Sequence, residues 1–140
     1  MSGPAEASIV LTKYLRELTS TYNRLIKILN LERKDIENSD EISLSEHTRL
    51  ESEAAEAVIS LTGTIYTYLE KIKPDAAAEE LLKSAIRLKE EARLMSRDNI
   101  ELLSGELIRL KARLSANKLP ITGRRVYYSG EIPTMMDIEI

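Results

Sequence analysis

The chain has 140 residues, of which 43% are hydrophobic and 31% charged, and its formal net charge is −3. This composition is typical of one folded domain and excludes a disordered or membrane-embedded chain. Cysteine is absent, which excludes disulfides, thiolate metal sites and a cysteine nucleophile. Tryptophan and phenylalanine are also absent, which favours leucine-based helix packing over a β-sandwich. The small net charge predicts neither a nucleic-acid nor a membrane partner.

The sequence shows neither a secretion signal nor a membrane-spanning segment. The first residues, MSGPAEAS, lack the basic region and apolar core of a secretion signal. No apolar run approaches the ~18 residues that a membrane helix needs. We therefore expect a cytoplasmic protein without membrane insertion.

A first helix is expected over residues 6–38. Its apolar residues alternate steps of four and three, which is the coiled-coil pattern that keeps one stripe, here called the seam, against a neighbour. The seam residues are Leu11, Leu15, Leu18, Tyr22, Leu25 and Leu29. Glu32 takes the next seam position and Ile36 resumes the pattern, while Ile26, Ile28 and Leu31 widen the stripe toward a second neighbour. Residues 38–41, NSDE, predict a turn.

A second helix is expected over residues 43–73. It opens with SLSE, residues 43–46, which matches a capping box. Pro74 predicts its end, and Gly63 weakens its middle. Its seam consists of Leu44, His47, Glu51, Ala54, Val58, Leu61, Ile65, Tyr68 and Ile72.

A third helix is expected over residues 75–118, with Asp75 as its N-cap. Its seam begins with Leu81, Ala85, Leu88, Ala92 and Met95. The steps then become four, four and four through Asn99, Leu103 and Leu107, a stutter that locally unwinds a supercoil. Leu110 and Leu114 continue the stripe to the end of the helix.

These lengths predict an all-α fold: an elongated antiparallel three-helix bundle or coiled coil with a long last helix. The bundle domain covers residues 1–119, and residues 120–140 form a flexible C-terminal tail. At about 1.5 Å per residue the first two helices span roughly 45 Å each and the third roughly 60 Å. Short links require the third helix to run back beside the second and to extend past the turn at residues 38–41.

The extending end of the third helix is the candidate binding site. It includes Leu107, Leu110 and Leu114, which lack an intrachain partner in this geometry, and exposed apolar stripes of this kind mark interaction sites. Three occupants fit the stripe: an external partner, a second copy of the chain, or the tail folded back. The candidate partner-binding residues are Asn99, Leu103, Leu107, Leu110, Leu114, Tyr127 and Tyr128.

Two members of this set have open roles. Asn99 lies on the seam, where a polar residue either fixes the register of the helices or offers its amide to a partner's backbone. Tyr127 and Tyr128 lie in the tail, where they either pack locally or anchor a partner, because tyrosine is enriched at interfaces.

The sequence predicts no catalysis, no metal and no cofactor. The lone His47 on a seam is a packing residue, and the Glu-x-x-His repeat of a di-iron bundle is missing. There is no phosphate-binding glycine loop and no nucleophile elbow. A basic cluster exists, but acidic residues are interspersed and the end of a helix explains it, so nucleic-acid binding is not expected. The cluster consists of Arg109, Lys111, Arg113, Lys118, Arg124 and Arg125.

Three motifs occur in order along the chain. LNLERKDIENSD, residues 29–40, places a glutamate–arginine pair before a short acidic turn. RDNIELLSGELIRL, residues 97–110, places an asparagine before a leucine-rich final helix, and Tyr127 or Tyr128 precedes Gly130. In this order and length, the chain resembles the FlgN-type flagellar export chaperones, small cytoplasmic helical proteins of bacteria.

The resemblance has departures as well as implications. Gly105 interrupts the last helix, Asn99 stands alone where members often show two asparagines, and the final MMDIEI has no counterpart. The resemblance implies a chaperone that binds the helical termini of hook–filament junction proteins. It would prevent their premature assembly and deliver them to the flagellar type III secretion machinery, with export-apparatus components as possible further partners. The alternative is a structural coiled-coil protein that forms homo-oligomers through the same seam.

Overall fold

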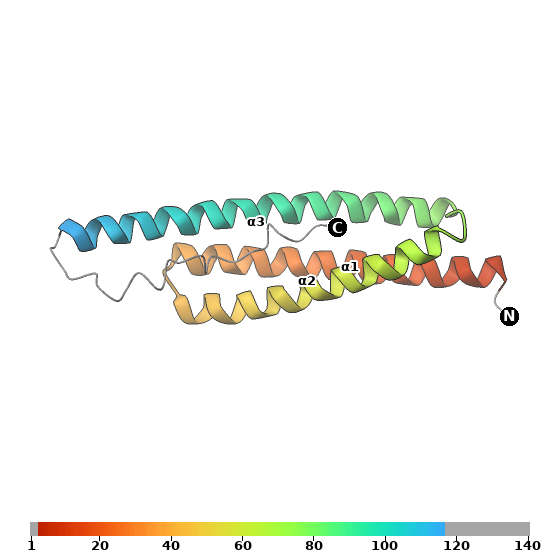
Figure 1. The fold of residues 1–140 in the computed structure, drawn as a ribbon, viewed down its shortest axis with the longest axis horizontal. Helices are drawn as coiled ribbons and strands as arrows, with labels where there is room; N and C mark the ends of the chain where they lie inside the picture. Colours follow the sequence, from red (N-terminus) through yellow and green to blue (C-terminus); the bar gives the residue numbers. More distant parts are fainter. Residues whose placement is uncertain (1–2, 117–140) are drawn as a thin grey trace.

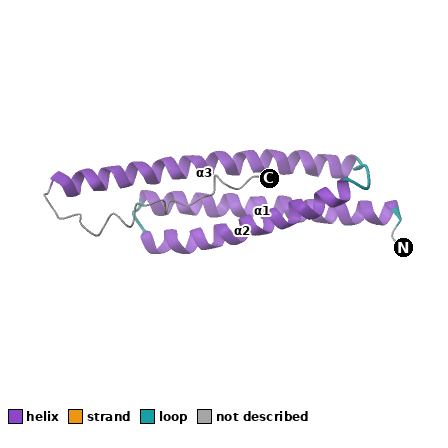
Figure 2. Cartoon of the chain, in the orientation of Figure 1, coloured by secondary structure: helices purple, strands orange, loops and turns teal. Residues whose placement is uncertain are grey.

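The fold consists of three long helices. The computed structural model describes residues 3–116, and these form α1 (Pro4–Glu37), α2 (Glu41–Leu69) and α3 (Ala76–Ala116). Figure 1 shows them side by side in an elongated bundle, and Figure 2 shows helices joined by short loops. The prediction of an all-α bundle with a long last helix is confirmed. None of these helices is long and apolar enough to cross a membrane.

The turn between α1 and α2 is a compact cap. The N–H of Asp40 donates to the carbonyl of Asp35 and the N–H of Ser39 donates to that of Ile36, at 2.8 and 3.2 Å. This is the pattern of a Schellman motif, in which the residue after the cap is left-handed. Ser39 is that residue, with φ of 55°. The turn therefore reverses the chain within three residues and places α2 antiparallel to α1.

The start of α2 differs from the prediction of a capping box at residues 43–46. The helix begins at Glu41, and the Asp40 carboxylate accepts a hydrogen bond from the Ser43 amide at 3.1 Å. Aspartate is as good an N-cap as serine, and Asp40 comes first in the chain, so Ser43 is already inside the helix. The predicted N-cap of α3 is confirmed, because Asp75 accepts from the Ala78 amide at 2.8 Å.

The end of α2 also differs from the prediction. The helix ends at Leu69 rather than at residue 73. The amides of Lys71 and Ile72 both donate to the Tyr68 carbonyl, so the chain turns before Pro74 is reached. A proline disfavours helical backbone at the residue before it, which limits how far the helix can continue.

Helix α1 is the centre of the bundle. It packs against both α2 and α3, whereas α2 and α3 make no close backbone contact with each other within residues 3–116. The predicted position of α3 beside α2 is therefore wrong in this respect, since its close neighbour is α1, to which it runs parallel (Figure 1). The wide stripe on α1 accounts for this, because it offers apolar surface to two neighbours.

The core confirms the seam predicted for α1. The buried residues of the core include Leu11, Leu15, Leu18, Tyr22, Leu25 and Leu29. The other two helices contribute mainly small side chains: Ala54 and Val58 on α2, and Ala78, Ala85 and Ala92 on α3. Large residues facing small ones allow the helices to interdigitate closely.

One end of the bundle is tied together. The Ser8 hydroxyl donates to Asp75 at 3.0 Å, which joins the start of α1 to the start of α3. Nearby, the rings of Tyr14 and Tyr68 lie 5.9 Å apart, within the range of a favourable aromatic pair. At the opposite end, α3 continues beyond the turn between α1 and α2 (Figure 1).

Candidate partner-binding surface

A hydrogen bond fixes how far α3 extends past its neighbours. The side-chain amide of Asn99 donates to the Leu29 carbonyl of α1 at 2.9 Å, so Asn99 and Leu29 lie at the same level of two parallel helices. This register places Glu37, the last residue of α1, level with Leu107. Residues 108–116 then project beyond α1 by roughly 13 Å. We call these residues the α3 extension.

The predicted stripe begins before the α3 extension and continues into it. Its four leucines, here called the stripe leucines, are Leu103, Leu107, Leu110 and Leu114. Among the described residues, none of them belongs to the core cluster or packs against it. Leu110 is 37% exposed and the other three are partly exposed. The extension therefore presents apolar surface that α1 and α2 do not cover.

Charged residues surround the stripe. Arg109 forms an ion pair with Glu106, one turn back along the helix. Lys111 and Arg113 are exposed and form no ion pair with another residue in the described range. Cations at this end of a helix are stabilised by the partial negative charge of the helix C-terminus.

Asn99 does not lie on this open surface. Asn99 is only 4% exposed, and its side-chain amide already donates a hydrogen bond to the Leu29 carbonyl. Of the two roles left open by the sequence, this geometry supports the fixing of register between α1 and α3. The prediction that Asn99 contacts a partner does not fit a buried side chain. Tyr127 and Tyr128 lie outside the described residues.

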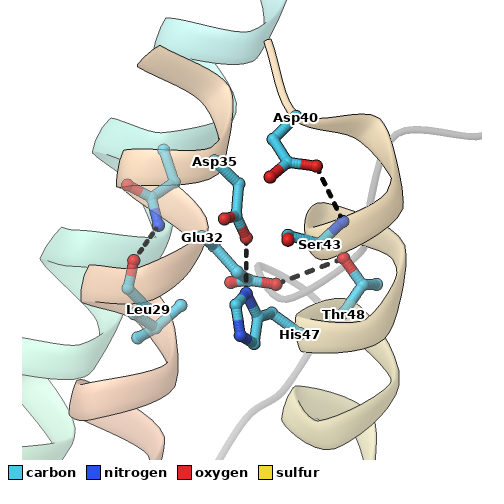
Figure 3. Close-up of polar contacts among 8 residues, drawn as sticks. Leu29, Glu32, Asp35, Asp40, Ser43, His47 and Thr48 are labelled. Atoms are coloured by element: carbon cyan, nitrogen blue, oxygen red, sulfur yellow. Dashed lines mark hydrogen bonds and ion pairs between the residues drawn. The ribbon is translucent and has the colours of Figure 1, made fainter. Parts of the chain in front are cut away.

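A buried polar cluster lies between α1 and α2, close to their turn. Figure 3 shows His47 beside Asp35 and Thr48 beside Glu32. The His47 Nδ1–H donates to Asp35 Oδ2 at 2.5 Å, and the Thr48 hydroxyl donates to Glu32 at 3.2 Å. His47 thus packs against a carboxylate, in agreement with its expected structural role.

Two carboxyl groups of this cluster are buried beside each other. Glu32 and Glu51 are each 2% exposed, and Oε1 of each accepts no conventional hydrogen bond from the described residues. Burial, and then a hydrogen bond to Glu32, raises the pKa of Glu51 to about 10. Burial also raises the pKa of Glu32. A protonated Glu51 can donate to an ionised Glu32, which satisfies both groups.

The sequence contained a signal for this cluster that was not recognised. Glu32, His47 and Glu51 were each placed on a seam, but separately. In an antiparallel pair, residues at equal distances from the turn face each other, so Glu32 is expected to lie level with residues near His47, and Glu51 follows His47 one helical turn further along α2. The seam positions therefore predict the cluster once the turn is fixed.

This cluster does not form a metal centre. Among residues 3–116, no group of three or more His, Asp or Glu side chains is arranged to hold a metal ion. The four ionisable members are instead paired two by two. Their arrangement serves the contact between α1 and α2.

Known proteins give no further indication of function. Comparison of the chain with protein-family models, with curated proteins and with solved structures finds no match in any of the three.

Proposed function

We propose that the protein is an export chaperone that binds an amphipathic helix of a client on the α3 extension. In the finer form of the proposal, the client is a flagellar hook–filament junction protein, and the chaperone acts in the cytoplasm before type III secretion. This finer form depends on the three sequence motifs that resemble the FlgN-type chaperones.

The observation that carries the proposal is the unequal length of the helices. α3 has 41 residues, whereas α1 has 34 and α2 has 29. The register set by Asn99 turns this difference into an extension at one end of the bundle. Leu110 and Leu114 lie in that extension, where α1 no longer provides a surface for them.

A client helix could complete the interrupted packing. Along the bundle, the seam of α3 faces α1, and beyond Glu37 that place is free of α1. An amphipathic helix with apolar residues at steps of three and four could lie there and contact the stripe leucines. The contact would be short, which suits a carrier that must release its cargo.

Binding of a labelled client helix tests the proposal. Fluorescence anisotropy would follow the terminal helix of a hook–filament junction protein titrated with the full chain. Leu110→Asp should weaken binding by about tenfold or more, because a charge replaces a central apolar anchor. The matched control is Ile86→Asp, since Ile86 is 65% exposed on α3 but lies within the bundle.

The outcomes separate the alternatives. Unchanged affinity of Leu110→Asp would remove the binding site from the α3 extension. Sedimentation of the free chain at micromolar concentration tests the structural alternative. A tight dimer that Leu110→Asp dissociates would favour a homo-oligomeric coiled-coil protein over a carrier.

A further inference from the structure

We propose that the helix bound by the α3 extension carries acidic residues beside its apolar stripe, and that the same charges reject a second copy of this chain. The inference rests on the proposed function, because it concerns the chemistry of the partner at that same surface. It is carried by the positions of the charged side chains relative to the stripe leucines.

The flanking positions of the stripe follow from its heptad pattern. If Leu107 and Leu114 occupy one seam position and Leu110 the other, the residues that border the seam are Glu106, Lys111 and Arg113. In coiled coils, these bordering residues approach those of the partner helix and determine which partner is accepted. Ile108, which is 69% exposed, and Arg109 lie on the outer side of the helix.

The bordering charge that is free to act on a partner is positive. Glu106 is already paired with Arg109, so its charge is compensated within α3. Lys111 and Arg113 are exposed on the two borders of the stripe, and neither pairs with another described side chain. A partner helix on the stripe therefore meets a cation on each side.

The bundle restricts how a second copy could approach. In a parallel arrangement, the second α3 would continue alongside the first and collide with α1, which occupies that side of α3 up to Glu37. Only an end-to-end, antiparallel overlap of two extensions leaves room for both bundles. That overlap places Lys111 near Lys111 of the copy and Arg113 near Arg113 of the copy, and like charges at these positions disfavour association.

A partner with acidic flanks reverses this effect. Glutamates beside its apolar stripe would pair with Lys111 and Arg113 in either orientation. Each such exposed pair contributes little, but two attractive pairs in place of two repulsive ones change affinity by about tenfold. The structure thus favours an acidic amphipathic helix of another protein as the occupant.

A charge-swap experiment with two designed peptides tests the inference. Both peptides are 16-residue helices with leucines at the seam positions; one has glutamates and the other lysines at the bordering positions. We expect the wild-type chain to bind the glutamate peptide about tenfold more tightly than the lysine peptide. The variant Lys111→Glu with Arg113→Glu should reverse this preference. The matched control is Lys83→Glu with Arg87→Glu. Both residues are exposed, but they lie on the part of α3 that runs beside α1, so this variant should behave as the wild type.

Sedimentation of the same proteins tests the rejection of a second copy. An equimolar mixture of wild type and the Lys111→Glu/Arg113→Glu variant should associate more strongly than either protein alone. If the wild type alone associates as strongly as the mixture, the rejection of a second copy is wrong. If the wild type binds both peptides equally, the charge selection is wrong while helix binding stands. If neither peptide binds the wild type or the variant, the proposed function fails as well.

Discussion

At the scale of single residues, the most unusual feature is the pair of buried glutamates. Glu32 and Glu51 occupy seam positions that leucine or alanine takes elsewhere in the bundle. Two carboxylates cannot both be ionised in such a place, so one proton is retained.

The retained proton predicts a dependence of stability on pH. The folded-state pKa of Glu51 is raised from 4.5 to about 10, so its contribution to stability is complete below pH 4.5 and is lost as the pH rises toward 10. Within this window, the free energy of unfolding should fall with pH by at most about 1.4 kcal/mol per unit from this group. Glu51→Gln should remove that slope and stabilise the protein at pH 8 by about 2 kcal/mol or more.

Urea unfolding at pH 5, 6.5 and 8 measures this effect. The difference between Glu51→Gln and the wild type should grow as the pH rises. Glu53→Gln is the matched control, since Glu53 is an exposed neighbour that pairs with Arg49. Parallel pH profiles for wild type and Glu51→Gln would show that Glu51 is not protonated in the folded protein.

Asn99 is another buried polar residue, and its side chain stabilises the contact between α1 and α3. Asn99→Ala should lower the free energy of unfolding by about 1–2 kcal/mol, because a buried hydrogen bond to the Leu29 carbonyl is lost. The affinity for a client helix should stay unchanged, since Asn99 is not part of the open surface. Chemical unfolding and peptide titration of one preparation provide both values, with the exposed Asp98→Ala as control. A loss of client affinity without a loss of stability would return Asn99 to the binding site.

At the scale of elements, the helices were predictable and their ends were less so. The step pattern of α1 predicted its buried residues because a seam with a period of 3.5 residues permits one packing solution. The start of α2 was mistaken because Asp40 and Ser43 are both good N-caps, and only the geometry of the turn selects between them. The neighbour of α3 was mistaken because connection length restricts direction, but not which of two available faces is used.

The cap of α2 gives a prediction at this scale. Asp40→Ala should lower the urea midpoint clearly, since it leaves the Ser43 amide without its acceptor. Ser43→Ala should have a much smaller effect, because the serine side chain is not the cap. Equal effects of the two substitutions would indicate that the predicted capping box forms after all.

The candidate site also has features that the sequence predicts and features that it does not predict. The extension of α3, with Leu110 and Leu114, could be predicted because helix length follows directly from residue number. Leu107 was expected there as well, but the register set by Asn99 places it level with Glu37. The burial of Asn99 could not be predicted, since an amide on a seam can bond to either of two backbones. The ion pair between Arg109 and Glu106 could not be predicted either, because it depends on the positions of the side chains. This ion pair leaves Lys111 and Arg113 as the charges that face a partner.

At the scale of the whole molecule, the two ends of the bundle differ. At one end, the hydrogen bond between Ser8 and Asp75 and the tilted aromatic pair of Tyr14 and Tyr68 join the helices. At the other end, α1 and α2 stop at their turn, and α3 continues past both of them (Figure 1). Within residues 3–116, one end of the bundle is therefore joined by side-chain contacts, and the other end presents α3 beyond α1 and α2.

Hydrogen–deuterium exchange along α3 tests this account most directly. The full chain would be measured alone and with the glutamate-flanked peptide at saturating concentration. We predict that exchange slows at the backbone amides of residues 108–116, because packing of a second helix suppresses fraying of the extension. The backbone amides of α2 should exchange at the same rate with and without the peptide. Protection confined to any other part of the bundle, with residues 108–116 unchanged, would contradict the assignment of the binding surface to the end of α3.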